Sequence, residues 1–208
     1  QLPILTSTDQ AISAAIGQLD TQVTVLQMAR MVAGVANGGT LYQPYVIQQV
    51  GGDDGATPSF VGQPTVVGNM GLSESTLDIV RKGMCDSTNT SAVNATNGEP
   101  LGTSWFVFDQ APPDGTGIAP YKVCAKTGTA QTARPEPNGW YVAFAPADDP
   151  QIAVAIAIPF GREGSETAAP IVRRILDAYF NAPQAPFPAW WFNLPYIDLT
   201  IPEGATGG

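Results

Sequence analysis

Apolar residues dominate one early segment, residues 20–37, and polar side chains interrupt it at only a few places. Gln27 and Arg30 lie three positions apart, so they share one narrow stripe of a helix. The pattern predicts a nearly buried helix over these residues. Asp20 or Thr21 provides a side chain that can cap its beginning.

Two further segments have the spacing of amphipathic helices. The first runs over residues 73–84, where Ser73 is the candidate cap and the apolar face consists of Leu77, Val80 and Met84. The second runs over residues 165–180 and has a wide apolar stripe. Its remaining side chains are expected to face water: Arg173, Arg174 and Asp177.

Strand-like runs occupy two regions of the chain. Residues 40–71 contain short alternating runs such as PYVIQQV, and three longer runs follow at 121–130, 140–146 and 151–160. Only a short turn sequence separates the last two runs, which predicts an antiparallel hairpin. The order of elements indicates an α/β (α+β) fold in which helices flank an antiparallel sheet.

Two segments lack a regular pattern. Residues 86–104 are rich in Asn, Thr, Ser and Gly and indicate a long surface loop that continues toward residue 120. Residues 182–208 form a Pro-rich and aromatic tail, separate from a domain over residues 1–181. Its aromatic side chains are expected to cover exposed core, with an interface as the alternative: Trp190, Trp191 and Phe192.

Composition excludes several classes of function. The formal net charge of −9 argues against nucleic acid as a partner, because phosphate binding requires clustered Lys and Arg. The chain has no histidine and no CxxC pair, which argues against zinc, and no other metal or cofactor is expected. Its two cysteines, Cys85 and Cys124, either form one disulfide or remain buried thiols.

The segment YKVCAKTGTAQ, residues 121–131, places Lys126 inside an otherwise apolar strand. A lysine there can sit beside a nucleophilic hydroxyl or an anionic group of a substrate. The hydroxyls of Thr127 and Thr129 can bind a carboxylate. Gly128, without a Cβ, lets an extended peptide approach the backbone. These four residues are the candidate site.

Several separated segments resemble class B penicillin-binding proteins, the peptidoglycan D,D-transpeptidases. K-T-G combined with S-x-x-K is a signature of these proteins and of serine β-lactamases. The segment AAIGQLDTQVTVLQMARMVAGVANGGT resembles the family's IGQ, TPLQMA and ANGG elements, and CAKTGTAQ followed by NGWYVAFAPADDPQIAVAI resembles its third strand and next hairpin. Three positions depart from the family's usual Gly, Pro and Gly without removing a reactive group: Leu19, Val25 and Ala125.

The resemblance lacks one essential element, the nucleophilic serine of S-x-x-K. The residues three positions before the chain's lysines are Ile79, Ala119 and Val123, none of them serine. Ser87-Thr88-Asn89 matches S-x-N formally but is interpreted as surface loop. The chain is therefore expected to be the C-terminal part of a transpeptidase domain, inactive alone. Without its usual cover, the edge strand at 121–130 predicts self-association.

The resemblance also implies roles and partners. Lys126 would help proton movement, Thr127 and Thr129 would bind a terminal carboxylate, and the Thr129 N–H would complete an oxyanion hole. The implied partners are peptidoglycan stem peptides, β-lactam antibiotics, the upstream half of the domain and other cell-wall synthesis proteins. The location would be the extracytoplasmic face of the membrane, anchored by an N-terminal segment absent from this chain. The alternatives are a serine β-lactamase or β-lactam sensor, and a non-catalytic wall-binding module.

Overall fold

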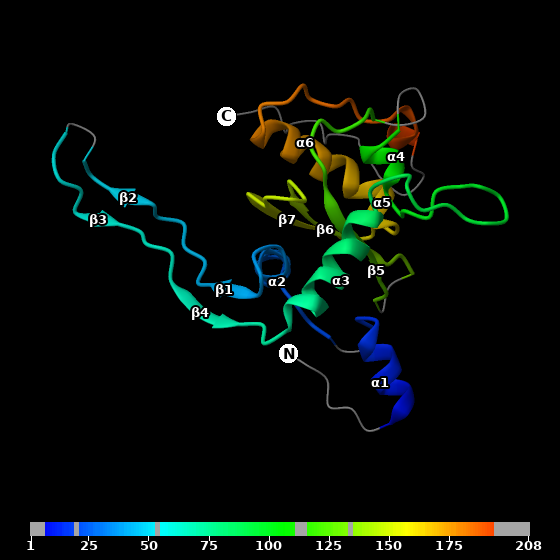
Figure 1. The fold of residues 1–208 in the computed structure, drawn as a ribbon, viewed down its shortest axis with the longest axis horizontal. Helices are drawn as coiled ribbons and strands as arrows, with labels where there is room; N and C mark the ends of the chain where they lie inside the picture. Colours follow the sequence, from blue (N-terminus) through cyan, green and yellow to red (C-terminus); the bar gives the residue numbers. More distant parts are fainter. Residues whose placement is uncertain (1–6, 19–20, 53–54, 111–115, 133–134, 194–208) are drawn as a thin grey trace.

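A three-stranded antiparallel sheet forms the centre of the molecule, as the sequence predicts (Figure 1). The computed structural model describes residues 7–18, 21–52, 55–110, 116–132 and 135–193. The strands are β5 (Cys124–Ala130), β6 (Asn138–Ala145) and β7 (Ile152–Ile158), in the order β5-β6-β7. The hairpin predicted from the short turn is the β6-β7 pair.

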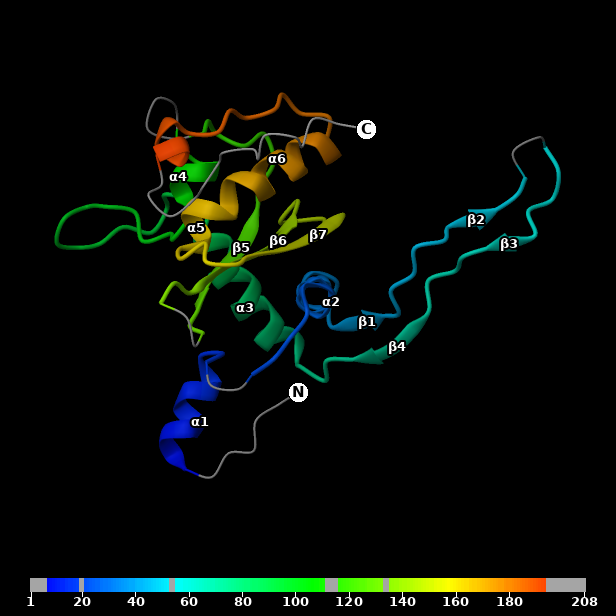
Figure 2. The ribbon, with the colours of Figure 1, turned by 180° about the vertical axis from the view of Figure 1, so that it is seen from behind.

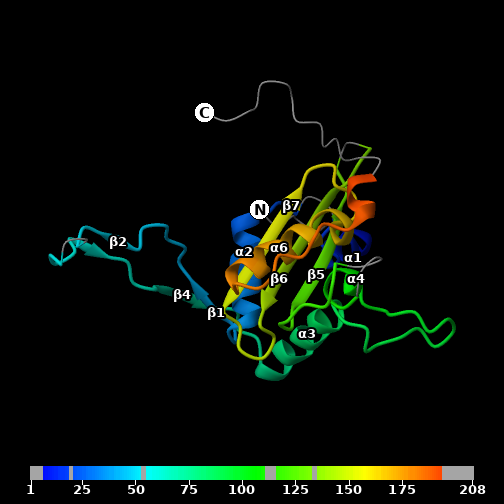
Figure 3. The ribbon, with the colours of Figure 1, turned by 90° about the horizontal axis from the view of Figure 1, so that it is seen from above.

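Helices cover both faces of this sheet (Figures 1 and 3). One face carries α2 (Val25–Ala36) and α3 (Glu74–Asp86). The other carries three helices: α4 (Trp105–Phe108), α5 (Gly164–Thr167) and α6 (Ala169–Tyr179). The mixed helical and antiparallel fold predicted from the sequence is thereby confirmed.

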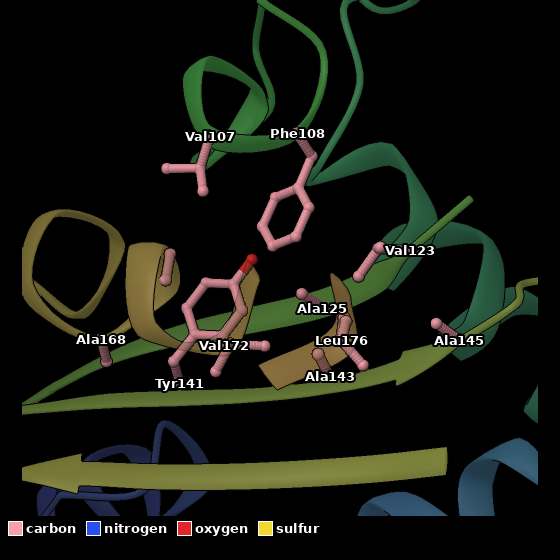
Figure 4. Close-up of a cluster of buried hydrophobic side chains, with 11 residues drawn as sticks. Val107, Phe108, Val123, Ala125, Tyr141, Ala143, Ala145, Ala168, Val172 and Leu176 are labelled. Atoms are coloured by element: carbon pink, nitrogen blue, oxygen red, sulfur yellow. The ribbon is translucent and has the colours of Figure 1, made fainter. Parts of the chain in front are cut away.

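Strand β6 contributes to two apolar cores because its side chains alternate between the faces of the sheet. Tyr141 and Ala143 join the core beneath α6, where Tyr141 stacks on Phe108 (Figure 4). Val142 and Phe144 join the core beneath α2 and α3. A strand buried on both faces reads as a continuous apolar run, which is the pattern of this segment.

Helix α2 is less buried than its sequence predicts. It begins at Val25, and Thr24 is its cap, in a reciprocal capping box with Gln27. Thr21 is not the cap, and Asp20 lies outside the described residues. The expectation of a nearly buried helix is wrong because the buried residues of α2 all lie in its C-terminal half, and Leu26 in its first turn is 60% exposed.

Helix α3 follows its prediction closely. Ser73 is its cap, and the hydroxyl of this residue accepts a hydrogen bond from the Thr76 N–H at 3.2 Å. Leu77 and Met84 are buried, whereas Val80 is partly exposed. A further helix that the sequence reading did not identify, α1 (Thr8–Ala15), precedes α2 and contains no buried residue.

The predicted third helix is divided into α5 and α6, and two of its charged residues are buried. Arg173 is 3% exposed and Asp177 is 0% exposed, so the expectation that they face water is wrong. The Arg173 Nε donates to Asp177 Oδ1 at 3.0 Å. The Arg173 Nη1 also donates to the carbonyl of Gly117 at 2.8 Å, which ties α6 to the segment that leads into β5.

Asp177 has two further partners inside this network. It accepts hydrogen bonds from the Tyr121 hydroxyl at 2.6 Å and from the Ala185 N–H at 2.9 Å. Burial, followed by the hydrogen bond and the charge of Asp177, raises the pKa of Tyr121 above its ordinary value. Burial likewise raises the pKa of Tyr141, whose hydroxyl lies 2.7 Å from the Ser104 hydroxyl.

A two-stranded ribbon extends away from the sheet between α2 and α3 (Figures 1 and 2). Its strands pair as two short antiparallel ladders, which confirms short strands in this region. The inner ladder joins β1 (Thr40–Tyr42) to β4 (Val66–Asn69), and the outer ladder joins β2 (Gln49–Val50) to β3 (Phe60–Val61).

The segments without a sequence pattern carry some structure. Helix α4, which the sequence reading missed, interrupts the segment expected to be loop. Within the tail, η1 (Ala189–Asn193) brings Trp190 edge-to-face against Phe106, so this residue covers core as expected. Trp191 donates to the Thr167 carbonyl at 3.4 Å, whereas Phe192 is largely exposed. The division between residues 181 and 182 stays a prediction. None of the helices in the described ranges has the length and apolar character needed to cross a membrane.

Candidate functional site

The KTGT residues lie on an edge strand. Strand β5 pairs with β6 alone among the described strands, so its other edge is open to a ligand. Lys126 pairs in register with Val142, and Gly128 pairs with Trp140. The side chain of Lys126 is exposed, and the next three residues are partly buried. The sequence-predicted site residues are therefore brought together on one accessible strand.

Side chains from the end of α3 cover the first half of this open edge. The Ser87 hydroxyl donates to the Ala125 carbonyl at 2.7 Å, and the Thr88 hydroxyl donates to the Val123 carbonyl at 2.5 Å. Thr88 is only 4% exposed. The interpretation of these two residues as surface loop is thus wrong, because they satisfy backbone groups that the sheet leaves unpaired.

The second half of the edge lies at Thr127 and Thr129. In an antiparallel strand, the N–H and C=O of alternate residues point to the same side. The carbonyls of Thr127 and Thr129 therefore face the open edge, like those of Val123 and Ala125. The Lys126 Nζ donates to the Thr127 carbonyl, which places the ammonium along this edge.

Gln18, from the segment between α1 and α2, also reaches this edge. Its Nε2 donates to the Thr129 carbonyl at 3.2 Å, across 111 positions of sequence. The hydroxyl of Thr21 in turn donates to the Gln18 carbonyl at 3.3 Å. In the sequence, Gln18 is part of the segment with the IGQ resemblance, and no local signal there indicates its contact with β5.

The two threonine hydroxyls have different neighbours. The Thr127 hydroxyl donates to the Thr103 hydroxyl at 3.4 Å. The Thr129 hydroxyl donates to Glu163 Oε2 at 3.2 Å. Both threonines alternate with Lys126 and Gly128 along the strand, so the hydroxyls lie on one face, and the Lys126 side chain leaves from the other face and turns to the edge at the Thr127 carbonyl.

Gly128 lies close to the paired strand. A Cβ on this residue would lie 3.2 Å from the Cβ of Trp140, so Trp140 would have to shift by a few tenths of an ångström to accept a side chain here. This close approach is independent of any ligand. That Gly128 also admits an extended peptide stays a prediction.

A disulfide joins α3 to the beginning of β5. Cys85 and Cys124 form this bond in the structure, which is one of the two states that the sequence left open for them. A cavity of about 480 Å³ adjoins the disulfide, with Cys85, Thr88 and Val123 in its wall. None of the KTGT residues lines it. In the part of the chain that the structure describes, three or more potential metal-ligating side chains do not gather anywhere.

Comparison with known families identifies one matching model, the penicillin-binding protein transpeptidase domain, which aligns with residues 5–177. The chain is 30% identical over 174 residues to the peptidoglycan D,D-transpeptidase PbpA of Mycolicibacterium smegmatis, covering 79% of this chain and 31% of that protein. It is 29% identical over 177 residues to penicillin-binding protein 2B of Streptococcus pneumoniae, covering 81% and 24%. The chain thus spans about a third or less of these relatives.

Solved structures agree with this comparison. The imipenem acyl-enzyme complex of penicillin-binding protein A from Mycobacterium tuberculosis superposes with a TM-score of 0.62 at 27% sequence identity. The match covers 81% of this chain and 33% of that one. The arrangement of helices around an antiparallel sheet is therefore shared with an enzyme that a β-lactam acylates.

Proposed function

Because this chain belongs to the penicillin-binding protein transpeptidase family, we propose that it forms the KTGT side of the active site of a peptidoglycan D,D-transpeptidase. The nucleophilic serine is supplied by an S-x-x-K motif in the upstream part of the same domain. This chain supplies the strand against which the substrate lies. The observation that carries the proposal is the open edge of β5 at Thr127 and Thr129.

Edge geometry explains how a stem peptide would bind. An extended peptide can add to an exposed sheet edge through main-chain hydrogen bonds. Ser87 and Thr88, next to α3, cover the first half of this edge, whereas at the second half the carbonyls of Thr127 and Thr129 accept hydrogen bonds from the side chains of Lys126 and Gln18. We place the peptide on the second half, where it binds the outward N–H groups and displaces these two side chains from the carbonyls.

The reaction then uses groups on this edge. The serine Oγ attacks the carbonyl between the two terminal D-Ala residues of a stem peptide, the C–N bond breaks, and D-Ala leaves with a proton on its nitrogen. The Thr129 N–H, which faces the open edge, donates to the developing oxyanion. Thr127 and Thr129 bind the terminal carboxylate, and the charge of Lys126 favours the serine's loss of its proton. An amine of a neighbouring stem then attacks the ester and releases the serine.

An apolar surface supports an intramolecular partner for this chain. Ile12 of α1 and Ile16, the residue that caps the end of this helix, are 60% and 75% exposed, and Leu26 of α2 is 60% exposed. Large apolar side chains exposed near one another on a helix mark a surface that another part of a protein can cover. We assign that role to the upstream half of the domain. β-Lactams are the proposed inhibitors, and the extracytoplasmic side of the membrane is the proposed location.

Labelling of the full-length protein with a fluorescent penicillin tests the proposal. We expect Lys126→Ala to slow acylation by about 100-fold or more, as expected for loss of a group that assists proton transfer. Lys122→Ala is the matched control, because the ammonium of this lysine is largely exposed near the other end of the strand and pairs with Asp148 at 3.8 Å. Equal labelling of the Lys126→Ala variant and the wild type would refute the assignment. Catalytic turnover of nitrocefin would instead indicate a β-lactamase.

A further inference from the structure

The carboxylate of Glu163 lies at the Thr129 hydroxyl. In the proposed function, this hydroxyl binds the carboxylate of the ligand. Its Oε2 accepts a hydrogen bond from the Thr129 hydroxyl at 3.2 Å. The adjacent Arg162 directs its guanidinium to Glu136, at 2.7 Å. The Glu163 side chain is exposed, so its carboxylate lies where a ligand could meet it.

The backbone holds Glu163 firmly in this place. Its carbonyl accepts hydrogen bonds from both the N–H and the hydroxyl of Thr167, each at 3.0 Å. The next residue, Gly164, lies so close to β6 that an added Cβ would come within 2.0 Å of the Trp140 carbonyl oxygen. The beginning of α5 is therefore pressed against the sheet, and the backbone from which the Glu163 side chain extends is fixed beside Thr129.

Two physical effects then oppose a ligand carboxylate at Thr129. A threonine hydroxyl has one proton to donate, so a hydroxyl that donates to Glu163 presents lone pairs to any other acceptor. Two carboxylates on one hydroxyl also repel each other, and close to the protein surface this repulsion is only partly screened.

We propose that Glu163 is a specificity-determining residue that weakens the binding of carboxylate-bearing ligands at Thr129. The inference rests on the proposed function, in which Thr129 receives the terminal carboxylate of a stem peptide or of a β-lactam. Its consequence is that ligands with a carboxylate acylate the protein more slowly than they would without Glu163. Glu163 does not take part in bond making, and it acts through its charge and through the hydroxyl of Thr129.

The test is Glu163→Gln in the full-length protein. Glutamine keeps the size and an acceptor oxygen but removes the charge, and its amide can turn so that the Thr129 hydroxyl is free to donate. We expect the second-order rate of acylation by a penicillin to rise about threefold to tenfold, the size of one charge repulsion at roughly 6 Å in a highly polar environment. The rate with an ester of the same penicillin, which lacks the carboxylate, should stay unchanged.

Two controls separate charge from structure. Asp148→Asn removes the same charge from an exposed position near the other end of β5 and should leave both rates unchanged. Glu163→Ala should raise the rate for the acid as well, because the competing acceptor is gone. The inference would be overturned if Glu163→Gln left the acylation rate with the free-acid penicillin unchanged or lower, or if the rates with the acid and the ester changed equally. In either case, labelling of the wild type would still support the proposed function. A wild-type protein that no penicillin labels would overturn both.

Discussion

Replacing Asp177 by Asn tests whether the buried ion pair on α6 holds the fold together. The carboxylate is fully buried and accepts hydrogen bonds from Arg173, Tyr121 and Ala185, at distances between 2.6 and 3.0 Å. Asparagine has nearly the same shape but offers one acceptor oxygen and one donor group. At least one donor is then left without an acceptor, and the guanidinium of Arg173 keeps a buried charge with no counter-charge.

The expected loss is large. Breaking a buried pair by removing one charge destabilises by about 3–5 kcal/mol, because the remaining charge is uncompensated. In a cooperative unit of about 150–250 residues each kcal/mol corresponds to roughly 2–4 °C, so the unfolding midpoint of such a unit should fall by about 6–20 °C, and by less in a larger one. Circular dichroism during heating measures the shift of the transition that includes this chain.

A matched control lies on α3. Lys82 and Asp86 form an ion pair with the same i,i+4 spacing, but both side chains are substantially exposed. Such a surface pair is worth about 0.3–0.5 kcal/mol, so Asp86→Asn should shift the midpoint by no more than about 2 °C. Equal shifts in the two variants would show that burial does not set the contribution of Asp177 and would refute the reasoning.

Three further expectations follow from contacts around β5. Because its surroundings raise the pKa of Tyr121, its protonated form stabilises the fold below pH ~10, and this contribution is lost as the pH rises further; Tyr121→Phe should make alkaline unfolding shallower. Cys85→Ser, which opens a link spanning 39 positions, should lower the free energy of unfolding by about 4 kcal/mol, measured by urea denaturation without reductant. Gln18→Ala removes the donor that holds the Thr129 carbonyl, so the peptide unit next to the oxyanion-binding N–H of Thr129 is less well fixed; we expect penicillin acylation to slow by about tenfold while the melting midpoint stays within about 2 °C.

The sequence predicted the sheet because the signals for it are local. The alternation along β6 and the short turn before β7 depend on neighbouring residues, and so does the cap at Ser73. The burial of Arg173 was also available from spacing. Ala169, Val172, Arg173 and Leu176 occupy positions i, i+3, i+4 and i+7, the buried face of a helix. Residue type led to the opposite expectation, since an unpaired arginine is rarely buried.

Contacts between distant segments could not be predicted in this way. The Ser87 hydroxyl meets β5 across 38 positions of sequence, and Gln18 meets it across 111. Nothing in the residues around either side chain specifies its partner. The KTGT residues were found because they are consecutive, whereas Glu163 enters the site from a turn that only the folded chain brings near. Local chemistry thus identified the strand, and tertiary structure supplied its neighbours.

The hydroxyls of Ser87 and Thr88 also oppose self-association through the edge of β5. An uncovered strand invites a second copy to extend the sheet, and long runs of free backbone groups lead to aggregation. Here side chains of the same chain already donate to the carbonyls of Val123, Ala125 and Thr129, so a second strand would have to displace them. Each displaced hydrogen bond reduces the net gain from adding that strand. The side chains that cover this edge therefore act as a barrier to polymerisation.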